Sequence, residues 1–474
     1  MRRSWVIANK DWRQAASDGR VWLAWLLALG TLAAAAFHGA AGLRQSEAER
    51  TIIAAQVRMQ WETQGEKNPH SAAHFGQFVF KPVTAPALID PGVNAATGQA
   101  IWLDPHRRNL ARHKPMEDQS PAERLVPAGI DGVLQWVLPL LVVLQGFGAI
   151  AGEREAGTWR MLASLGVSPR HLLIGKLAGL GWILAPLCVF FIAVLGWVAK
   201  RHGLQDTDTL IRVVGLALLY TVYLAIFGLL ALGISARTAT ASRALAILLL
   251  LWGINGFVAP RLGTTLAQAA VETPSTEEFH AAIQRDIQFG MDQDGDANTR
   301  QQRFLKTILA RYGVSRAEDL PVGLRGLRLL DNDAYSSRVH EKHFQDLENR
   351  FIAQTHWQLW ASATGPLVPV RAISQALAGT DIHHHLRFAT AAETYRRSFV
   401  DATSERILHS NRGTDNDATA GNTFWASIAP FAYQAPTWHW ALQQQGAAIS
   451  VLMLWLLGAA IFAITGLRGL TKGL

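Results

Sequence analysis

The chain has 474 residues, of which 50 % are hydrophobic and only 17 % are charged, and its formal net charge is +8. Soluble chains carry about 25 % charged residues, and here the apolar residues form long blocks, which excludes an ordinary soluble protein. The basic residues are scattered without a long Lys/Arg run, which disfavours nucleic acid as a partner. The one cysteine, Cys188, lies in an apolar block, so no disulfide can form within the chain.

Residues 1–20 combine basic side chains with an apolar face at helical spacing. The residues of this face recur at intervals of three or four: Trp5, Ala8, Trp12, Ala15 and Ala16. Tryptophan prefers the headgroup region and basic residues suit anionic lipid. We therefore expect a cytoplasmic amphipathic helix on the inner leaflet, with a simple extension of the first span as the alternative.

Six apolar blocks approach the roughly 20 residues that a helix needs to cross a bilayer. The first resembles a signal peptide in its Ala-rich stretch, but its length and its long polar lead favour a retained anchor. The fifth is short and is expected to end at Pro260. We predict an all-α polytopic membrane protein whose spans lie at Val21–Leu43, Ile130–Gly152, Leu172–Val198, Ile211–Ile234, Ala244–Val258 and Ala447–Leu467.

The short segments 152–171 and 235–243 and both chain ends are basic, and with six spans they share one side of the membrane. The positive-inside rule makes that side the cytoplasm, so the two long segments face outward. The predicted organisation is a cytoplasmic interfacial helix at 1–20, a first span at 21–43, an extracytoplasmic segment at 44–128, four spans at 129–258, a mostly helical extracytoplasmic domain at 259–445, and a last span with a cytoplasmic tail at 446–474.

Within the second outer segment, four amphipathic stretches predict helices, and residues 411–422 are expected to be disordered. Adjacent histidines on a helix point in different directions, so we expect no shared metal site at 383–385. The predicted helices are Thr276–Phe289, Asn298–Arg311, Ala334–Trp357 and Thr390–His409.

The segment between the second and third spans, EREAGTWRMLASLGVSPRHLLIGK, predicts a short helix at the membrane surface. Gly157 can adopt the left-handed conformation that ends a helix, Thr158 can cap a new helix, and Gly166 can end it. Ser168 is a natural N-cap, and Pro169 suits the first position of the next helix.

This segment resembles the intracellular loop of ABC-2 type permeases, which has a Glu, then Gly-Thr, Leu-rich residues, a small-residue turn and Gly-Lys. In that family the loop forms the coupling helix that docks on a separate ATPase. The resemblance places a coupling helix at 153–168 and implies ATPase coupling through Glu153, Gly157, Thr158, Arg160, Leu162, Leu165, Ser168 and Pro169. The loop 234–244 is also similar, and the run Pro366–Arg397, with Glu393, Tyr395 and Arg396, resembles the DUF3526-containing subfamily.

The resemblance implies a transporter subunit of the bacterial inner (plasma) membrane that is not itself an enzyme. The sequence lacks a phosphate-binding P-loop, so ATP and Mg²⁺ would be bound by the partner ATPase, and we expect no catalytic residue, metal or cofactor in this chain. The expected partners are ABC ATPase subunits, a second permease subunit that is identical or paralogous, and membrane lipids.

Ionisable residues are scarce within the spans, which disfavours an ion-coupled carrier. Four polar residues there are candidates for lining a pathway: Gln135, Gln145, Tyr220 and Tyr223. The predicted function is coupling of ATP hydrolysis to substrate export or extraction. The alternative is a membrane-anchored scaffold or assembly factor that acts through its extracytoplasmic domain.

Overall fold

The computed structural model describes residues 2–112, 114–118, 129–164, 166–201, 206–291 and 293–472. Six helices among these residues are long and apolar enough to cross a membrane: Val21–Glu62, Ile130–Glu155, Pro169–Val194, Thr207–Arg237, Ala241–Ala270 and Gly446–Leu470. The chain is therefore an all-α polytopic membrane protein, which confirms the predicted fold class.

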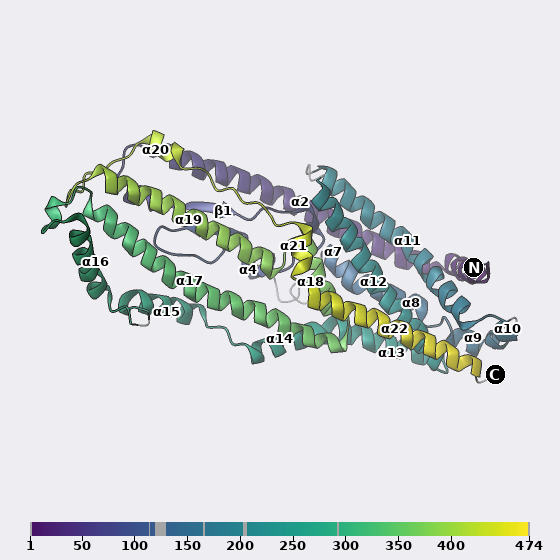
Figure 1. Cartoon of the computed structure of the whole chain (residues 1–474). Coiled ribbons are helices and arrows are strands. Elements are labelled where there is room, and N and C mark those ends of the chain that lie inside the picture. The colour runs from purple at the N-terminus through teal and green to yellow at the C-terminus, as the bar shows by residue number, and fades with distance from the viewer. Residues whose placement is uncertain are drawn as a thin grey trace.

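The molecule is elongated, and both ends of the chain lie at one end of it, beside α9 (Ala151–Glu155) and α10 (Thr158–Ser164) (Figure 1). We call this the terminal end. The opposite end carries α16 (Ala297–Tyr312) and α20 (Asn422–Ser427). Residues 63–118 and 271–443, which lie between the spans in the sequence, are called the distal part.

The spans pack around an apolar core to which α2, α8, α11, α12, α13 and α22 all contribute. Fully buried members include Leu32, Leu134 and Tyr223. The helices of this part are α1 (Arg2–Ser17), α2 (Gly19–Glu62), α7 (Ile130–Gly132), η2 (Val133–Val137), α8 (Leu138–Gly146), α11 (Pro169–Arg201), α12 (Thr207–Arg237), α13 (Ala241–Gly253), η3 (Ile254–Val258), α14 (Ala259–Ala270) and α22 (Gly446–Lys472).

The first span is longer than the predicted 21–43, because α2 continues through Arg44 without a break. No proline interrupts this stretch, so the predicted span and the helical stretch that follows it form one helix of 44 residues. At 1.5 Å per residue it is about 66 Å long, roughly twice the thickness of a hydrocarbon core. The helix thus links the spans rigidly to the distal part.

The fifth span does not end at Pro260 as predicted, because α13 runs through η3 into α14. The segment η3 is π-helical, and the Ala259 N–H bonds to the Ile254 carbonyl five residues back. This shift in register immediately precedes Pro260. In a regular α-helix, proline has no N–H to donate, and its ring clashes with the carbonyl four residues before it. The second span uses the same arrangement, since π-helical η2 directly precedes Leu138 and Pro139.

The distal part is mostly helical, with one described sheet in which β1 and β2 pair antiparallel and Gln77 lies opposite Leu103. Its first segment contains α3 (Pro69–Ala73), β1 (Gln77–Phe80), η1 (Ala85–Leu88), α4 (Asn94–Thr97), β2 (Ala100–Leu103) and α5 (Pro115–Asp118). Its second contains α15 (Thr276–Phe289), α16, η4 (Ala317–Asp319), α17 (Leu324–Gln358), η5 (Leu359–Thr364), α18 (Leu367–Ala378), α19 (Ile382–Ser410), α20 and α21 (Trp438–Gln443).

Local signals fix several of these helices. Ser275 and Glu278 form a capping box at α15, and Asp296 caps α16. Residues 411–422, which were predicted to be disordered, instead pair their main chain with distant segments through Gly323–Gly413 and Lys67–Ala420 bridges. Such pairing leaves no local pattern in the sequence.

One helix of the distal sequence lies among the spans. The apolar side chains of α18 pack in the same core as α12 and α22. Arg212 of α12 strengthens this junction, because its guanidinium donates to the carbonyls of Leu377 at 3.1 Å and Pro436 at 2.6 Å. The membrane and distal parts therefore share one packed boundary.

Candidate functional site

A group of polar side chains at the terminal end joins α1 to the loop between the second and third spans. Glu153 Oε1 accepts a hydrogen bond from Lys10 Nζ at 2.6 Å and lies 3.6 Å from Lys176 Nζ. Lys176 donates to Asp11 Oδ1 at 2.9 Å, and the Thr158 hydroxyl donates to the Glu153 carboxylate. Burial raises the pKa of Asp11, although Lys176 opposes the shift. We call these five residues the Glu153 cluster.

An apolar cluster beside α10 reinforces this joint. Trp159 of α10 is buried in it together with residues from four longer helices and from the turn before α9. Its buried members are Ile7, Ile150, Trp159, Leu172, Ala236 and Leu467. A force applied to α10 would therefore act on α1, α11, α12 and α22 together.

Two glycines bound α10 as the sequence predicted. Gly157 and Gly166 have φ angles of 72° and 67°, the left-handed conformation in which glycine avoids a steric cost. Thr158 is the first residue of α10, and its hydroxyl donates to the Glu153 carbonyl at 3.2 Å. The helix ends at Ser164.

The remaining predicted coupling residues lie on or beside α10. Arg160 and Leu162 belong to the helix, whereas Leu165 lies outside the described residues. Pro169 opens α11, and Ser168 Oγ before it accepts from the His171 N–H at 3.4 Å. The structure thus divides the predicted 153–168 helix into α9, a glycine turn and α10.

The second short loop contacts the first. Arg154 donates to the Thr238 carbonyl at 2.9 Å. Ser235 Oγ accepts from the main-chain N–H groups of Ile150 and Ala151 and donates to the Phe147 carbonyl. These bonds give partners to the main-chain groups where the helix is interrupted before α9. The two short loops therefore form one surface at the terminal end.

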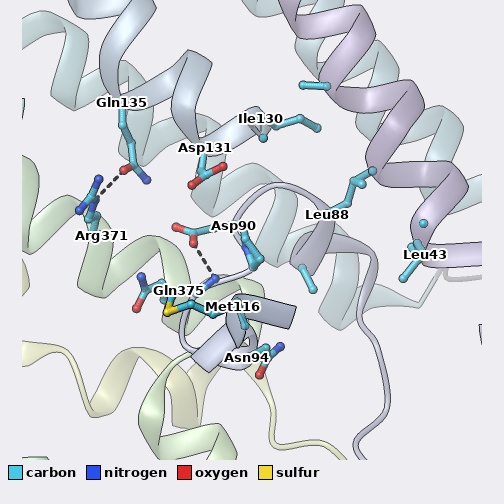
Figure 2. A pocket seen from close by; sticks show the side chains of 18 of the residues that line it. Leu43, Leu88, Asp90, Asn94, Met116, Ile130, Asp131, Gln135, Arg371 and Gln375 are labelled. Carbon is cyan, nitrogen blue, oxygen red and sulfur yellow. Dashed lines mark hydrogen bonds between the residues drawn. The ribbon is translucent and has the colours of Figure 1, made fainter. Parts of the chain in front are cut away.

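A cavity of about 710 Å³ lies where the spans meet the distal part. Asp90 and Asp131 direct their carboxyl groups into it, and Arg371 and Gln375 of α18 line the same space (Figure 2). Asp90 Oδ1 accepts from the Gly92 N–H at 3.0 Å, and burial raises the pKa of this carboxyl. Asp131 Oδ1 has no hydrogen-bond partner among the described residues. The lining offers both acceptors and a cation to a polar ligand.

Gln135 connects this cavity to a buried network. Its Oε1 accepts from Arg371 Nε at 2.7 Å, and its Nε2 donates to the Tyr220 hydroxyl at 3.3 Å. Tyr220 also bonds Ser374 of α18 at 3.0 Å, and the Tyr223 hydroxyl donates to the Gln135 carbonyl at 3.1 Å. Three of the four predicted pathway residues thus meet in one network.

The network continues into the fifth span. Asn255 Nδ2 donates to the Tyr223 hydroxyl at 2.9 Å, and Asn255 Oδ1 accepts from the Leu367 N–H at 2.9 Å. Gln135 lies on η2 and Asn255 on η3, so both π-helical segments place a polar side chain here. Such π turns are frequent at functional sites.

The fourth predicted pathway residue, Gln145, lies ten residues beyond Gln135 on α8 and outside the cavity lining. Sequence reasoning missed three residues of this site: Asp90, Asn255 and Arg371. Asp131 was visible as a carboxylate at the start of a span, but nothing in the local pattern showed that Asp90 faces it.

In the run His383–His385, the side chains of His384 and His385 are buried and that of His383 is half-buried. Asp381 caps α19 by accepting from the His384 N–H at 3.0 Å, and it also binds the ring of that histidine. Burial, reinforced by Lys81, lowers the pKa of His385 to about 3.

A different group brings three imidazoles together: His70, His74 and His106. Burial, with the neighbouring His106 and His74, lowers the pKa of His70 to about 4. The sequence prediction did not include this group.

Residues 276–434 match the family model described as Domain of unknown function (DUF3526). The match covers about a third of the chain and runs from α15 past α20. It contains the buried pair of Glu393 and Arg396, whose two hydrogen bonds are 2.7 Å long. The predicted DUF3526 resemblance is thus confirmed for this region. No curated protein matches the chain.

Proposed function

We propose that this chain is the permease subunit of an ABC-2 type transporter of a bacterial inner membrane. A separate ATPase would bind ATP and Mg²⁺, and a second permease subunit, identical or paralogous, would complete the pathway. The terminal end would face the cytoplasm, because the basic loops and chain ends gather there. The distal part would lie outside, and the substrate would be exported or extracted.

The observation that carries this proposal is the anchoring of α10. Trp159 ties this short helix to α1, α11, α12 and α22, and the Glu153 cluster ties its start to α1 and α11. Met161 on the same helix is exposed. An ATPase that docks on the exposed face of α10 would therefore move several spans at once.

Such a movement would change the shape of the cavity. The cavity is bordered by both π-helical segments and by α18, whose contacts with Gln135 and Asn255 are hydrogen bonds that can exchange partners. Rocking of α11 and α12 relative to α18 would change the access to Asp90 and Asp131. A polar substrate suits this lining.

The test is the ATPase rate of the chain co-expressed with its neighbouring ATPase and reconstituted in lipid. Glu153→Ala should retain the complex but lower the rate roughly fivefold, as expected from the loss of about 1 kcal/mol at a partly buried ion pair. Gly157→Trp should weaken the complex itself, since its φ of 72° disfavours any side chain.

Glu155→Ala is the matched control, because Glu155 is exposed, lies two residues after Glu153 and does not belong to the Glu153 cluster. Its rate should equal that of the unmodified chain. If no ATPase co-purifies, or if all three variants behave alike, the coupling proposal fails. The membrane-anchored scaffold would then be the better description.

A further inference from the structure

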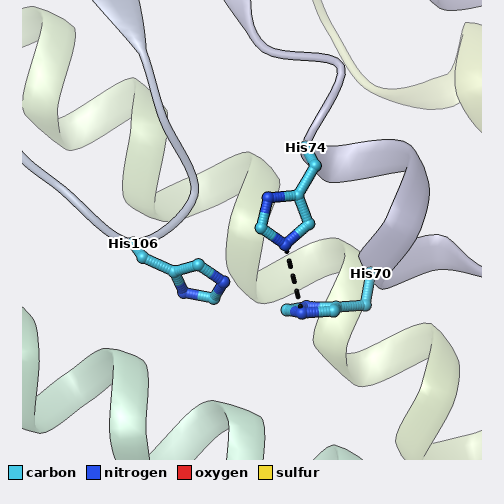
Figure 3. A group of neighbouring side chains, drawn as sticks. All are labelled: His70, His74 and His106. Atoms are coloured by element: carbon cyan, nitrogen blue, oxygen red, sulfur yellow. Dashed lines mark hydrogen bonds between the residues drawn. The ribbon is translucent and has the colours of Figure 1, made fainter.

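Three imidazoles from two separated segments meet in the distal part (Figure 3). His70 lies on α3 and His74 directly follows this helix, so their spacing of four residues places them on one face. His106 comes from the turn after β2. The Nε2 atoms of His70 and His74 are 3.3 Å apart, and one ligand atom from each of the three rings lies within 4.8 Å of the others.

This spacing suits a metal ion. Zinc binds histidine nitrogen at about 2.0–2.1 Å with tetrahedral geometry, which places neighbouring ligand nitrogens about 3.4 Å apart. His70 and His74 already have this separation, and a small rotation of the exposed His106 ring would complete the triangle. Imidazole ligands favour zinc, copper or nickel over calcium and magnesium, which prefer oxygen.

The turn that carries His106 is held from several sides. The His106 N–H donates to Asp104 Oδ1 at 2.9 Å, and Arg396 donates to the neighbouring Pro105 carbonyl at 2.7 Å. His106 Nδ1 lies 3.3 Å from Asp333 Oδ1, and the other oxygen of this buried carboxylate has no partner among the described residues. A carboxylate on the second ring nitrogen is the usual support for a metal-binding histidine.

The helix that carries the other two rings is supported as well. Asn68 caps α3 by accepting from the His70 N–H at 3.1 Å and donates to the Ala418 carbonyl at 3.3 Å. Lys67 pairs its main chain with Ala420. The helix that carries His70 and His74 is therefore held against Ala418 and Ala420 of the second distal segment.

We propose that His70, His74 and His106 bind one divalent transition-metal ion of the zinc class, with a fourth position open to water or a ligand. Asp333 is the positioning residue for His106. The ion would cross-link α3 to the turn after β2 and, through Asp333, to α17. This proposal is independent of the proposed function, since it concerns the isolated chain.

The experiment uses the full chain purified in detergent without a polyhistidine tag, treated with a chelator and then titrated with Zn²⁺. We expect one tightly bound ion per chain and an increase in the melting temperature. His74→Ala and His106→Ala should abolish both effects. Asp333→Asn should weaken binding about tenfold or more. Co²⁺ in place of Zn²⁺ should give the absorption of a four-coordinate site, altered in Asp333→Asn.

His280→Ala is the matched control, because His280 is also an exposed histidine of the distal part. It should bind zinc as the unmodified chain does. Because His74 is exposed, its truncation should leave the metal-free melting temperature unchanged, which separates loss of binding from misfolding. The proposal is overturned if zinc binds no more tightly to the unmodified chain than to His74→Ala, or if the triad variants still retain one tight ion.

Discussion

At the residue scale, buried histidines make the stability of the distal part depend on pH. His385 is buried beside Lys81, and its pKa is about 3 in the folded chain, against 6.5 for an exposed imidazole. Between these values the unfolded chain binds a proton that the folded chain does not. Stability is therefore highest above pH 6.5 and falls as the pH decreases toward 3.

We expect His385→Gln to reduce this dependence. At pH 5, protonation of His385 in the unfolded chain lowers the free energy of unfolding by about 2 kcal/mol. The reason is that pH 5 lies about 1.5 units below the unfolded pKa, and each unit is worth about 1.36 kcal/mol. The melting temperature should therefore fall less for the variant than for the unmodified chain between pH 7.5 and 5. Equal decreases in the two proteins would contradict the assignment to His385.

The residue scale is also where sequence reasoning was weakest. The spacing of His70 and His74 is a local signal that could have been read, whereas His106 joins them only through the fold. Likewise, Gln135 was recognised as polar within a span, but its partner Arg371 lies 236 residues away. Sites assembled from distant segments leave only part of their pattern in any one segment.

At the element scale, close packing of α1 on α11 depends on small residues. A Cβ atom at Gly175 would lie 2.7 Å from the Ile7 Cβ and 2.9 Å from the Ser4 carbonyl oxygen. Of the predicted apolar face, Ala8 and Ala15 are buried, whereas Trp5 is exposed and its ring lies 4.6 Å from that of Trp182. The helix thus contacts a span directly, and its position on the inner leaflet stays a prediction.

We expect Gly175→Leu to detach α1, because overpacking at such a contact costs about 1–3 kcal/mol. Amide hydrogen exchange in residues 2–17 should accelerate roughly tenfold or more. Gly181→Leu is the control on the same helix, since a Cβ there meets nothing within 4 Å. If exchange is unchanged in Gly175→Leu, or rises equally in both variants, the close packing is not what holds α1.

The elements that could be predicted are those with strong local signals. Long apolar blocks located all six spans, the glycines at 157 and 166 located α10, and the amphipathic pattern located α15. The π turns were not predicted. The sequence prediction ended the fifth span at Pro260, whereas in the structure a π-helical shift of register just before this proline lets the helix continue. The continuity of α2 was missed because composition changes at Arg44 although helical geometry does not.

At the scale of the whole molecule, an even number of spans places both chain ends together and the distal part opposite them. Figure 1 shows this separation directly, with the ends beside α10 and the distal helices far from it. The arrangement follows from six spans, whereas its direction in the membrane rests on the basic loops. Separation and direction can be tested together in intact cells.

The test replaces Cys188 by alanine and introduces one cysteine at a time, at Arg13 or at Glu277, both exposed. A membrane-impermeant maleimide should label Glu277→Cys in cells with a permeable outer envelope, but Arg13→Cys only after the inner membrane is disrupted. The reverse pattern would keep the fold and invert the proposed orientation, which would also deny a cytoplasmic ATPase access to α10. Labelling of both sites from the same side would contradict the six-span arrangement itself, because Arg13 and Glu277 are separated by five of the spans.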